Sequence, residues 1–507
     1  MNAEWRFPQP LPISRWAGRA VFLLSLLVAA LPVSAATLGV DDARHLLSRT
    51  AFGATPAEIE AYSKLTREQA ADRLLAGTAR APSTPPPAWT SEPFERRGYA
   101  GMSAEERKLA RREMNQKAFE LQTWWLGEML ATPSPLTEKM TLFWHNHFVS
   151  SQGKVRSPQL MYRQNAIFRE HALGDFGRLL HAASRDPAMV IYLDSAANRK
   201  GKPNENFARE VMELFTLGEG NYGENDIKEA ARAFTGWSVD PETGEFRFRP
   251  ALHDEGEKTV LGRTGNLTGE AVLDILLEQP KTAEYLVGKM WREFISPQPD
   301  PAEVKRIAAV FRDSRYDIRT PVRALLVSDA FYAPHNRGTL IKSPVDLVVG
   351  TLRQFQFQTG DMLPFVLATN QLGQVLFAPP NVKGWPGGEA WINSTTLLRR
   401  KAFLDRLFRV EELRPVMTAG NGDGASMEKM EAPRGLNQIN KGQERYMRAL
   451  TDIRFESSRW LAQFGTADPA RLQRVVLAAA PVSVPSPGLQ GMELIRHYAL
   501  DPVYQLK

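Results

Sequence analysis

Apolar residues recur at the spacing of an α-helix along most of this chain. Capping boxes that start at Thr55, Thr66 and Ser103 mark the beginnings of three early helices. The pattern predicts a mostly α fold class, a multi-helix globular domain. The expected helices lie at 41–52, 56–64, 67–77, 103–131, 135–149, 158–172, 174–184, 205–217, 226–236, 280–295, 301–313, 320–332, 344–358 and 361–376.

Strand-like alternation is limited to a short stretch. The segment GEFRFRP at 244–250 alternates apolar and polar residues, and EKTVLG follows at 257–262. We predict that these two segments pair as a small β-hairpin near 244–262. Its turn would contain His253, Asp254 and Gly256.

The two ends of the chain differ from its centre. Arginines precede an apolar run of about 14 residues and then small residues, which predicts a signal peptide at 1–35, cleaved after Ala35. The run is shorter than the roughly 20 residues of a membrane-spanning helix, so we expect no stable membrane span after cleavage. An exported main helical domain at 36–411 would follow, then a flexible linker at 412–436 and a helical extension at 437–507. We expect a periplasmic or extracellular location.

Composition restricts the chemistry. The chain has no cysteine, so it forms neither disulfides nor thiolate metal sites, and any metal must be held by histidine, carboxylate or amide groups. Its net charge is +6, of which the predicted signal peptide supplies +2. An excess of +4 over the remaining chain does not favour nucleic acid as a partner. Phosphate-binding, dinucleotide-binding, GxSxG and HExxH motifs are also absent from the sequence.

The stretch PNENFARE at 203–210 opens the helix expected at 205–217, with Asn204 as its N-cap and Gly218 after its end. At helical spacing, Glu205, Asn206, Arg209, Glu210, Glu213 and Thr216 share its polar side. One interpretation is a solvated face joined by ion pairs of Arg209 with Glu205 and Glu213. The other is a cluster of Asn206, Glu210 and Glu213 that binds a divalent cation or transfers a proton, with Arg209 keeping one carboxylate ionised.

Two histidine motifs are further candidates. His145 and His147 are two residues apart, so on a regular helix they diverge by about 200° and cannot both ligate one ion. They are either buried core residues or include a metal ligand. His253 and Asp254 occupy the expected hairpin turn, where polar residues are common in any case.

A glycine-rich loop, NVKGWPGGEAWINS, presents Trp385 and Trp391. Tryptophans before a helix that begins near Asn393 can simply fill the core. They can equally line a ligand or sugar pocket, because the loop is tight and irregular.

The motifs together resemble a known family. AFGATPAEIE, LFWHNHF, DPAMVIYLD, PNENFAREVMELFTLGEG, YGENDIKEAARAFTGW, HDEGEKTVLG and PPNVKGWPGGEAWINS occur in this order over roughly 41–411. They are similar to the bacterial exported family catalogued as domain of unknown function 1800. The resemblance implies a helical, exported protein, often encoded beside a secreted partner of an alkaline phosphatase or sulfatase-like family. It implies no particular reaction.

We therefore hypothesise an exported hydrolase. Its predicted catalytic residues are Glu210, Glu213, His145 and His147; its predicted substrate-binding residues are Asn206, Arg209, His253, Asp254, Trp385 and Trp391. Glu210, Glu213 and His147 are the predicted ligands of a possible divalent cation. One alternative is a non-catalytic export or assembly partner of the neighbouring secreted protein, in which the polar motifs form a structural network. Another is a carbohydrate-binding module that uses the Trp-Pro-Gly-Gly loop.

Overall fold

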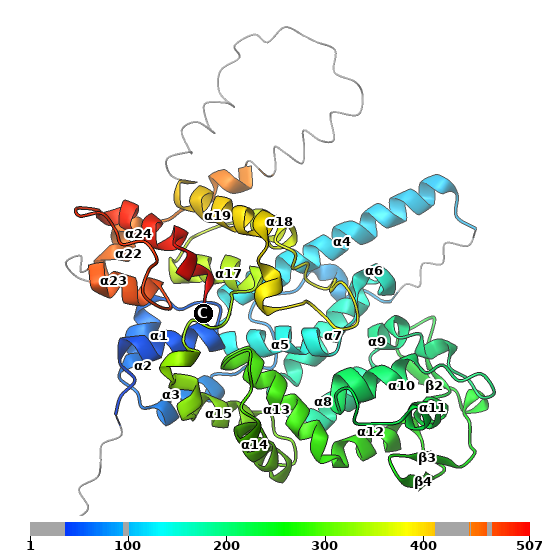
Figure 1. The fold of residues 1–507 in the computed structure, drawn as a ribbon. Coiled ribbons are helices and arrows are strands. Elements are labelled where there is room, and N and C mark those ends of the chain that lie inside the picture. The colour runs from blue at the N-terminus through cyan, green and yellow to red at the C-terminus, as the bar shows by residue number, and fades with distance from the viewer. Residues whose placement is uncertain (1–35, 95–100, 411–445, 447, 464–468) are drawn as a thin grey trace, which may run out of the picture. The chain divides into compact units, whose positions relative to one another are not determined.

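The computed structural model describes residues 36–94, 101–410, 446, 448–463 and 469–507. This part of the chain is mostly helical, which confirms the predicted fold class. The predicted signal peptide at 1–35 and the predicted linker at 412–436 lie outside the described residues. Figure 1 shows the arrangement of the helices and strands.

The helices and strands are numbered in chain order, as in Figure 1. The first half contains α1 (Gly39–Thr50), α2 (Pro56–Ser63), α3 (Arg67–Ala76), η1 (Ala88–Ser91), α4 (Ala104–Ala131), α5 (Pro135–His147), α6 (Gln152–Val155), α7 (Pro158–Glu170), α8 (Phe176–Arg185), α9 (Pro187–Tyr192), η2 (Ser195–Ala197), α10 (Asn206–Glu210), the π-helix η3 (Val211–Thr216), α11 (Glu224–Ala233), β1 (Trp237–Val239) and β2 (Phe246–Phe248). The second half contains η4 (Pro250–Leu252), β3 (Lys258–Val260), β4 (Arg263–Gly265), α12 (Gly269–Glu278), α13 (Pro280–Phe294), α14 (Pro301–Asp313), α15 (Arg319–Val327), α16 (Asp329–Tyr332), η5 (Pro334–Asn336), α17 (Pro344–Gln354), α18 (Leu363–Gln371), η6 (Gly388–Trp391), α19 (Ser394–Phe408), α22 (Ser457–Ala462), α23 (Pro469–Val476), α24 (Gly491–Leu500) and η7 (Pro502–Gln505).

Local signals set the helix starts. The three predicted capping boxes form, and in the first the Thr55 hydroxyl accepts from the Glu58 amide at 3.2 Å while the Glu58 carboxylate accepts from the Thr55 amide at 2.8 Å. Each box satisfies backbone donors that a helix N-terminus otherwise leaves unpaired. Prolines in the first turn of α5, α7, α13 and α17 also favour helix starts, because the fixed φ of proline suits that position. The predicted segment 320–332 divides into α15 and α16, and α12 was not predicted.

Helix α5 is central to the arrangement that positions the candidate site. It contacts α1, α4 and α7, and Figure 1 shows it beside α13 as well. Except for Pro135 and Asn146, its residues are buried, among them Trp144, which is fully enclosed. Helices of this kind are held by tertiary packing on all sides rather than by one amphipathic face. His145 and His147, at the end of α5, therefore meet other elements and not bulk solvent.

The strands differ from their predicted pairing. β1 pairs with β2, and β3 pairs with β4, each antiparallel. The predicted hairpin between 244–250 and 257–262 is therefore wrong, although both segments contain strands. The connection between them is held against α11, because Asp254 binds Arg232 at 2.9 Å and His253 Nδ1 donates to the Thr235 carbonyl at 2.9 Å. Each strand instead pairs with the strand that its own short turn brings closest.

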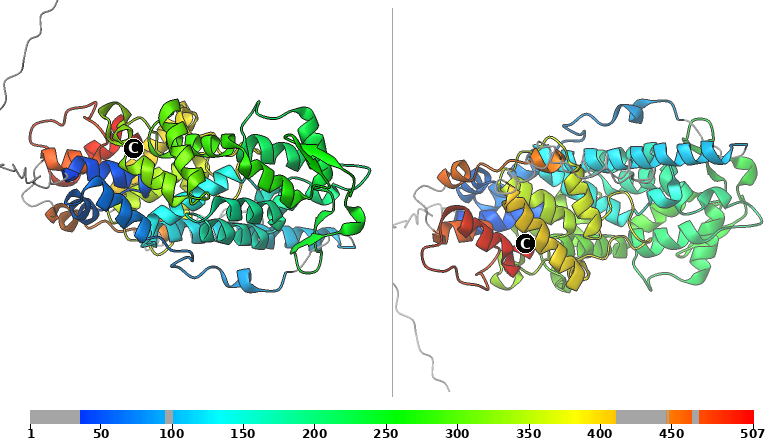
Figure 2. Two further views of the ribbon diagram at one scale, coloured as in Figure 1. Left: turned by 90° about the horizontal axis from the view of Figure 1, so that it is seen from below. Right: turned by 90° about the horizontal axis from the view of Figure 1, so that it is seen from above.

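The C-terminal residues pack onto the rest of the chain. Residues Thr37–Lys507 cluster as one compact unit, and both views in Figure 2 place the C-terminal helices beside α1 and α2. The indole of Trp460 donates to the Gln354 carbonyl at 2.8 Å, and the Lys342 amide donates to the Gln505 carbonyl at 2.8 Å. Within the predicted extension at 437–507, Trp460 therefore packs against α17, and Gln505 binds the segment that precedes α17. In the same described ranges, no helix has the length and apolar character needed to cross a membrane.

Candidate functional site

Three successive side chains at the end of α5 point to three different partners. His145 Nε2 accepts from the Asn165 amide at 3.0 Å, within the core. The Asn146 side-chain oxygen accepts from the backbone amide of Trp385 at 2.7 Å. His147 Nε2 donates to the carbonyl of Phe215 at 3.1 Å. The end of α5 therefore joins α7, the Trp-Pro-Gly-Gly loop and η3.

Both histidines are core residues in the structure. His145 is 2% exposed and lies against the ring of Trp125, and His147 is 1% exposed and lies against Phe148. Burial lowers the pKa of each imidazole well below its ordinary value, helped by the charge of Arg169 near His145 and of Lys289 near His147. Both rings are therefore neutral at neutral pH and separated from solvent. This placement corresponds to the core alternative, and a catalytic role for either stays a prediction.

His145 belongs to a longer buried polar chain. Its partner Asn165 accepts from Arg169 at 2.7 Å, and Arg169 forms an ion pair with Glu138 at 2.6 Å. Glu138 also accepts from the indole of Trp125 at 2.8 Å. Buried polar groups that satisfy one another in this way fix how helices pack.

The predicted helix at 205–217 contains a change of helical type. α10 gives way to the π-helix η3, in which the Leu217 amide donates to the carbonyl of Met212, five residues earlier. The wider turn moves Thr216 inward, where it is buried and donates to the Val211 carbonyl at 2.6 Å. Placing Thr216 on the polar side was therefore wrong. A π-helical turn within a helix frequently marks a functional site.

The carbonyl groups that end η3 are satisfied by side chains. Tyr285 donates to Leu214 at 3.2 Å, while Phe215 accepts from His147. The Asn221 side-chain amide donates to the carbonyls of Leu217, Gly218 and Glu219 at 3.0 to 3.2 Å. These contacts replace the intrahelical donors that a helix C-terminus lacks.

Arg209 and the acids pair differently from the prediction. Arg209 binds Glu224 through two contacts of 2.9 Å and Glu205 through one of 3.3 Å. Glu213 instead accepts from the Tyr222 hydroxyl at 2.7 Å. The predicted pair between Arg209 and Glu213 is absent among the described contacts, because the loop after η3 brings other partners within reach.

Glu210 stands out from its neighbours. It is half-buried and, within the described ranges, forms no hydrogen bond or ion pair. Burial raises the pKa of its carboxyl, the charge of Glu213 raises it further, and the charges of Arg209 and Lys383 oppose this. Asn206 does not extend toward it, since its amide donates to the Leu193 carbonyl at 3.2 Å.

The predicted cation ligands do not come together. Among the described residues, no group of three or more histidine, aspartate or glutamate side chains is arranged to hold a metal ion. Glu210, Glu213 and His147 therefore do not form a ligand set, since His147 is turned to the Phe215 carbonyl. His253 and Asp254 lie elsewhere, against α11, where Arg232 lowers the pKa of Asp254 to about 2.

The Trp-Pro-Gly-Gly loop walls a cavity of about 420 Å³. Trp385 and Trp391 line it and are 4% and 5% exposed. Gly384 has φ +86°, and a Cβ there would lie 2.9 Å from the Asn146 carbonyl oxygen, so only glycine suits the position. The other lining residues are Lys139, Leu142, Phe143 and Asn146 of α5, Lys289, Arg292 and Glu293 of α13, Pro297, Leu340, Ile341, Ser343, Asp346, Gln374, Pro386, Gly387, Gly388 and Lys507.

Four charged side chains of this lining form a closed ring. Lys139 contacts Asp346 at 2.6 Å and Glu293 at 3.2 Å, and Lys507 contacts the same two acids at 2.7 and 3.4 Å. The charges in the ring cancel. The carboxylates, with Asp346 closest, hold the pKa of Lys139 above its ordinary value even though the side chain is buried.

A comparison with protein families identifies the chain. The sequence profile described as "Protein of unknown function (DUF1800)" matches residues 45–484. The chain belongs to the DUF1800 family. The match extends beyond the 41–411 stretch in which we found the motifs. No curated protein and no solved structure matches the chain.

Five of the seven DUF1800 motifs contact one another in the structure. LFWHNHF contacts the PNENFARE helix and the Trp-Pro-Gly-Gly loop through His147 and Asn146. YGENDIKEAARAFTGW contacts HDEGEKTVLG through Arg232 and Asp254 and through Asp226, which accepts from the Leu261 amide at 2.8 Å, and it contacts the PNENFARE helix through Glu224 and Arg209.

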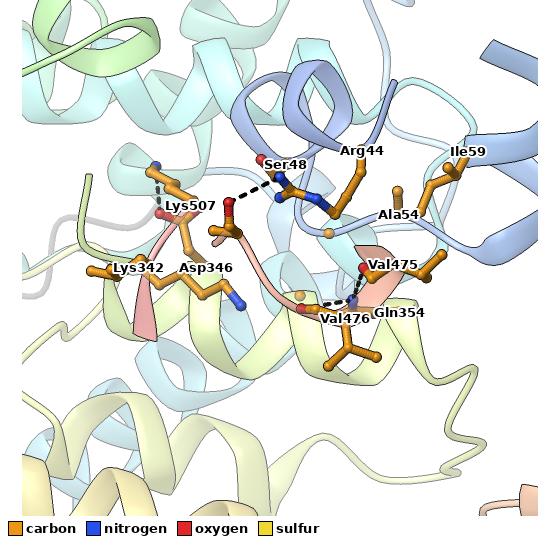
Figure 3. Close-up of a pocket in the computed structure, with 14 residues that line it drawn as sticks. Arg44, Ser48, Ala54, Ile59, Lys342, Asp346, Gln354, Val475, Val476 and Lys507 are labelled. Atoms are coloured by element: carbon orange, nitrogen blue, oxygen red, sulfur yellow. Dashed lines mark hydrogen bonds and ion pairs between the residues drawn. The ribbon is translucent and has the colours of Figure 1, made fainter. Parts of the chain in front are cut away.

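A second, smaller cavity of about 30 Å³ shares Asp346 and Lys507 with the first. Figure 3 shows it, with Arg44 contributed by α1 and Gln354 by α17, the helix that also carries Asp346. Burial lowers the pKa of Lys342, which also lines it, to about 7. Its volume suits a water molecule rather than an organic ligand.

Sequence reasoning missed Asn146, Lys289, Arg292 and the ring around Asp346. Asn146 lies between the two histidines that drew attention, and Lys289 and Arg292 are one turn apart in α13, which was predicted as 280–295. Helical spacing places Lys289 and Arg292 near each other. No local signal indicates that a loop about a hundred residues later covers them.

Proposed function

We propose that this DUF1800 protein is an exported enzyme of the hydrolase class, in which Glu210 donates a proton and Glu213 accepts one. The observation that carries the proposal is the contrast between the two carboxylates on neighbouring turns of the α10–η3 helix. Glu210 is half-buried without a partner and has a raised pKa, whereas Glu213 accepts from the Tyr222 hydroxyl. Two carboxyls whose surroundings differ in this way suit opposite acid and base roles.

The proposed reaction is the addition of water across a bond to a leaving group. Glu213 takes a proton from the water, whose oxygen bonds to the atom under attack. Glu210 gives its proton to the leaving atom as the old bond breaks, so protons and electron pairs balance. His147 would serve as a positioning residue, because it holds the Phe215 carbonyl at the end of η3. Asn206 and Arg209 would hold the start of the same helix through Leu193 and Glu224.

Export and a partner complete the proposal. The predicted signal peptide supports a periplasmic or extracellular location, and the family resemblance supports a co-encoded secreted protein of the alkaline phosphatase or sulfatase-like type as partner.

One observation favours a second candidate function, that of a non-catalytic assembly partner. His145 and Asn165 belong to a polar chain whose members satisfy one another inside the core, as a purely structural network would. A carbohydrate-binding module that stacks an extended polymer on its outer surface has less support, because both Trp385 and Trp391 are nearly enclosed and border an internal cavity instead.

Matched variants test the hydrolase proposal. Purified mature protein is assayed on a panel of chromogenic esters, phosphate esters and glycosides, beside Glu210→Gln, Glu213→Gln and the control Glu219→Gln, an exposed acid of the following loop. We expect at least one class to be hydrolysed, with a loss of about a hundredfold or more in kcat/KM for each of the first two variants. The control should keep full activity.

Two outcomes would contradict the proposal. One is the absence of hydrolysis of every class by the unaltered protein. The other is activity in Glu210→Gln and Glu213→Gln equal to that of Glu219→Gln, with circular dichroism spectra showing that all three variants are folded.

A further inference from the structure

Two cations that line the cavity under the Trp-Pro-Gly-Gly loop lack acidic partners. Lys289 and Arg292 lie one turn apart on α13, and neither forms an ion pair with a carboxylate among the described residues. The other two lining cations, Lys139 and Lys507, are neutralised by Asp346 and Glu293 in the closed ring. The cavity therefore has two uncompensated positive charges on one wall.

The surroundings of Lys289 make the lack of a partner costly. Its side chain is partly buried, and desolvation together with the neighbouring charge of Arg292 lowers its pKa to about 8. Arg292 is exposed, and among the described residues it donates only to the carbonyl of Gly288, at 3.2 Å, so most of its guanidinium donors stay available. An anion placed between the two side chains would relieve their mutual repulsion.

Trp385 lines the same cavity, and its indole N–H is buried without a hydrogen-bond partner among the described residues. A buried donor left unpaired costs free energy, so such groups normally have a protein, water or ligand acceptor. Asn146 fixes this tryptophan in place by accepting from its backbone amide.

The remaining walls are apolar, and the cavity has the size of a small-molecule site. Leu142, Phe143 and Trp391 line it beside Trp385. Its volume of about 420 Å³ lies within the range of cavities that hold cofactors and small ligands. Aromatic walls suit the flat face of a ring, and a lysine with an arginine suits an oxyanion, which the guanidinium can bind through two parallel hydrogen bonds.

We propose that this cavity binds a small organic anion, with its carboxylate or phosphate group between Lys289 and Arg292 and its ring against Trp385 and Trp391. The site goes beyond the proposed hydrolase reaction, because it concerns what is bound and does not depend on Glu210 or Glu213. If the reaction is also correct, the natural substrate is acidic.

Calorimetry with matched sugars tests the site. Glucose 6-phosphate and glucuronate supply the two oxyanions on the same ring, and glucose supplies the ring alone. The full mature protein is compared with Lys289→Met, with Arg292→Gln and with the control Lys281→Met, an exposed lysine of the same helix that pairs with Glu284. We expect either acidic sugar to bind, at least about tenfold more tightly than glucose, and each cavity variant to weaken binding by about tenfold. Lys281→Met should bind as the unaltered protein does.

Two results would overturn the site. One is no binding of either acidic sugar by the unaltered protein, and the other is equal binding in Lys281→Met and the two cavity variants. Glu210→Gln separates this proposal from the hydrolase proposal. If that variant binds the acidic sugar normally while no hydrolysis is detected in the unaltered protein, the reaction fails and the anion site stands.

Discussion

Replacing Asp346 by asparagine should lower the free energy of unfolding by about 3 to 5 kcal/mol. Asp346 is 5% exposed and accepts from Lys139 at 2.6 Å and from Lys507 at 2.7 Å. At an effective dielectric constant of 20, the attraction in each pair would be about 4 kcal/mol at 4 Å, but desolvation of the buried charges offsets much of it. The variant retains that desolvation and loses the attraction, so Glu293 alone would face two buried ammonium groups.

Urea unfolding followed by tryptophan fluorescence and by circular dichroism measures the change, and coincident transitions justify a single free energy. Asp329→Asn is the matched control, since Asp329 is fully exposed and its pair with Arg67 should contribute nothing measurable. Adding Lys139→Met to Asp346→Asn should recover part of the loss, because it removes one stranded charge. A loss for Asp346→Asn as small as that for Asp329→Asn would refute the reasoning.

Two further predictions concern pH and the glycine of the Trp loop. Burial lowers the pKa values of three histidines, His45, His145 and His147, and that of His45 falls to about 2. Below pH ~6.5 the unfolded chain therefore takes up protons that the folded chain does not. The contribution of the three histidines to the free energy of unfolding should therefore be complete above that pH. It should decrease by up to about 1.4 kcal/mol per pH unit for each histidine as the pH falls. Urea midpoints that do not decrease between pH 7.5 and 5 would contradict this. Gly384→Ala should lower the free energy of unfolding by about 2 kcal/mol or more, because φ is +86° and the new Cβ would meet Asn146. Gly77 has a negative φ and looser surroundings, so Gly77→Ala should have a smaller effect in the same assay.

Helices could be predicted from the sequence because their signals are local. The caps at Thr55 and Thr66 and the apolar spacing that follows each lie within one or two turns. The strand partners could not be predicted in this way. Each strand is three residues long, and each pairs across a short connection, β1 with β2 and β3 with β4. Strands this short carry too few alternating residues for the sequence to distinguish between possible partners.

The candidate site shows the same limit. Spacing correctly separated His145 from His147, since they point to different elements. It could not reveal that η3 departs from the α-helical period, because the sequence was compared with a repeat of 3.6 residues, so Thr216 was placed among the acids. The contacts of the ring around Asp346 join positions up to 214 residues apart, so no local stretch of sequence predicts it.

The polar residues of the DUF1800 motifs differ in how many hydrogen bonds and ion pairs they form within the protein. Those with the fewest such partners are the stronger functional candidates. Arg232 and Asp254 bind each other and nearby backbone groups, so stability accounts for both. The same holds for Asn146, which fixes the loop through Trp385. Glu210 and the indole of Trp385 have no comparable partner among the described residues. Lys289, which lies outside the motifs, has no carboxylate partner there, and its ammonium lies 5.6 Å from the centre of the Tyr285 ring. A polar group that is partly or fully buried without a polar partner costs stability, so an external ligand or reaction explains those three better than stability does.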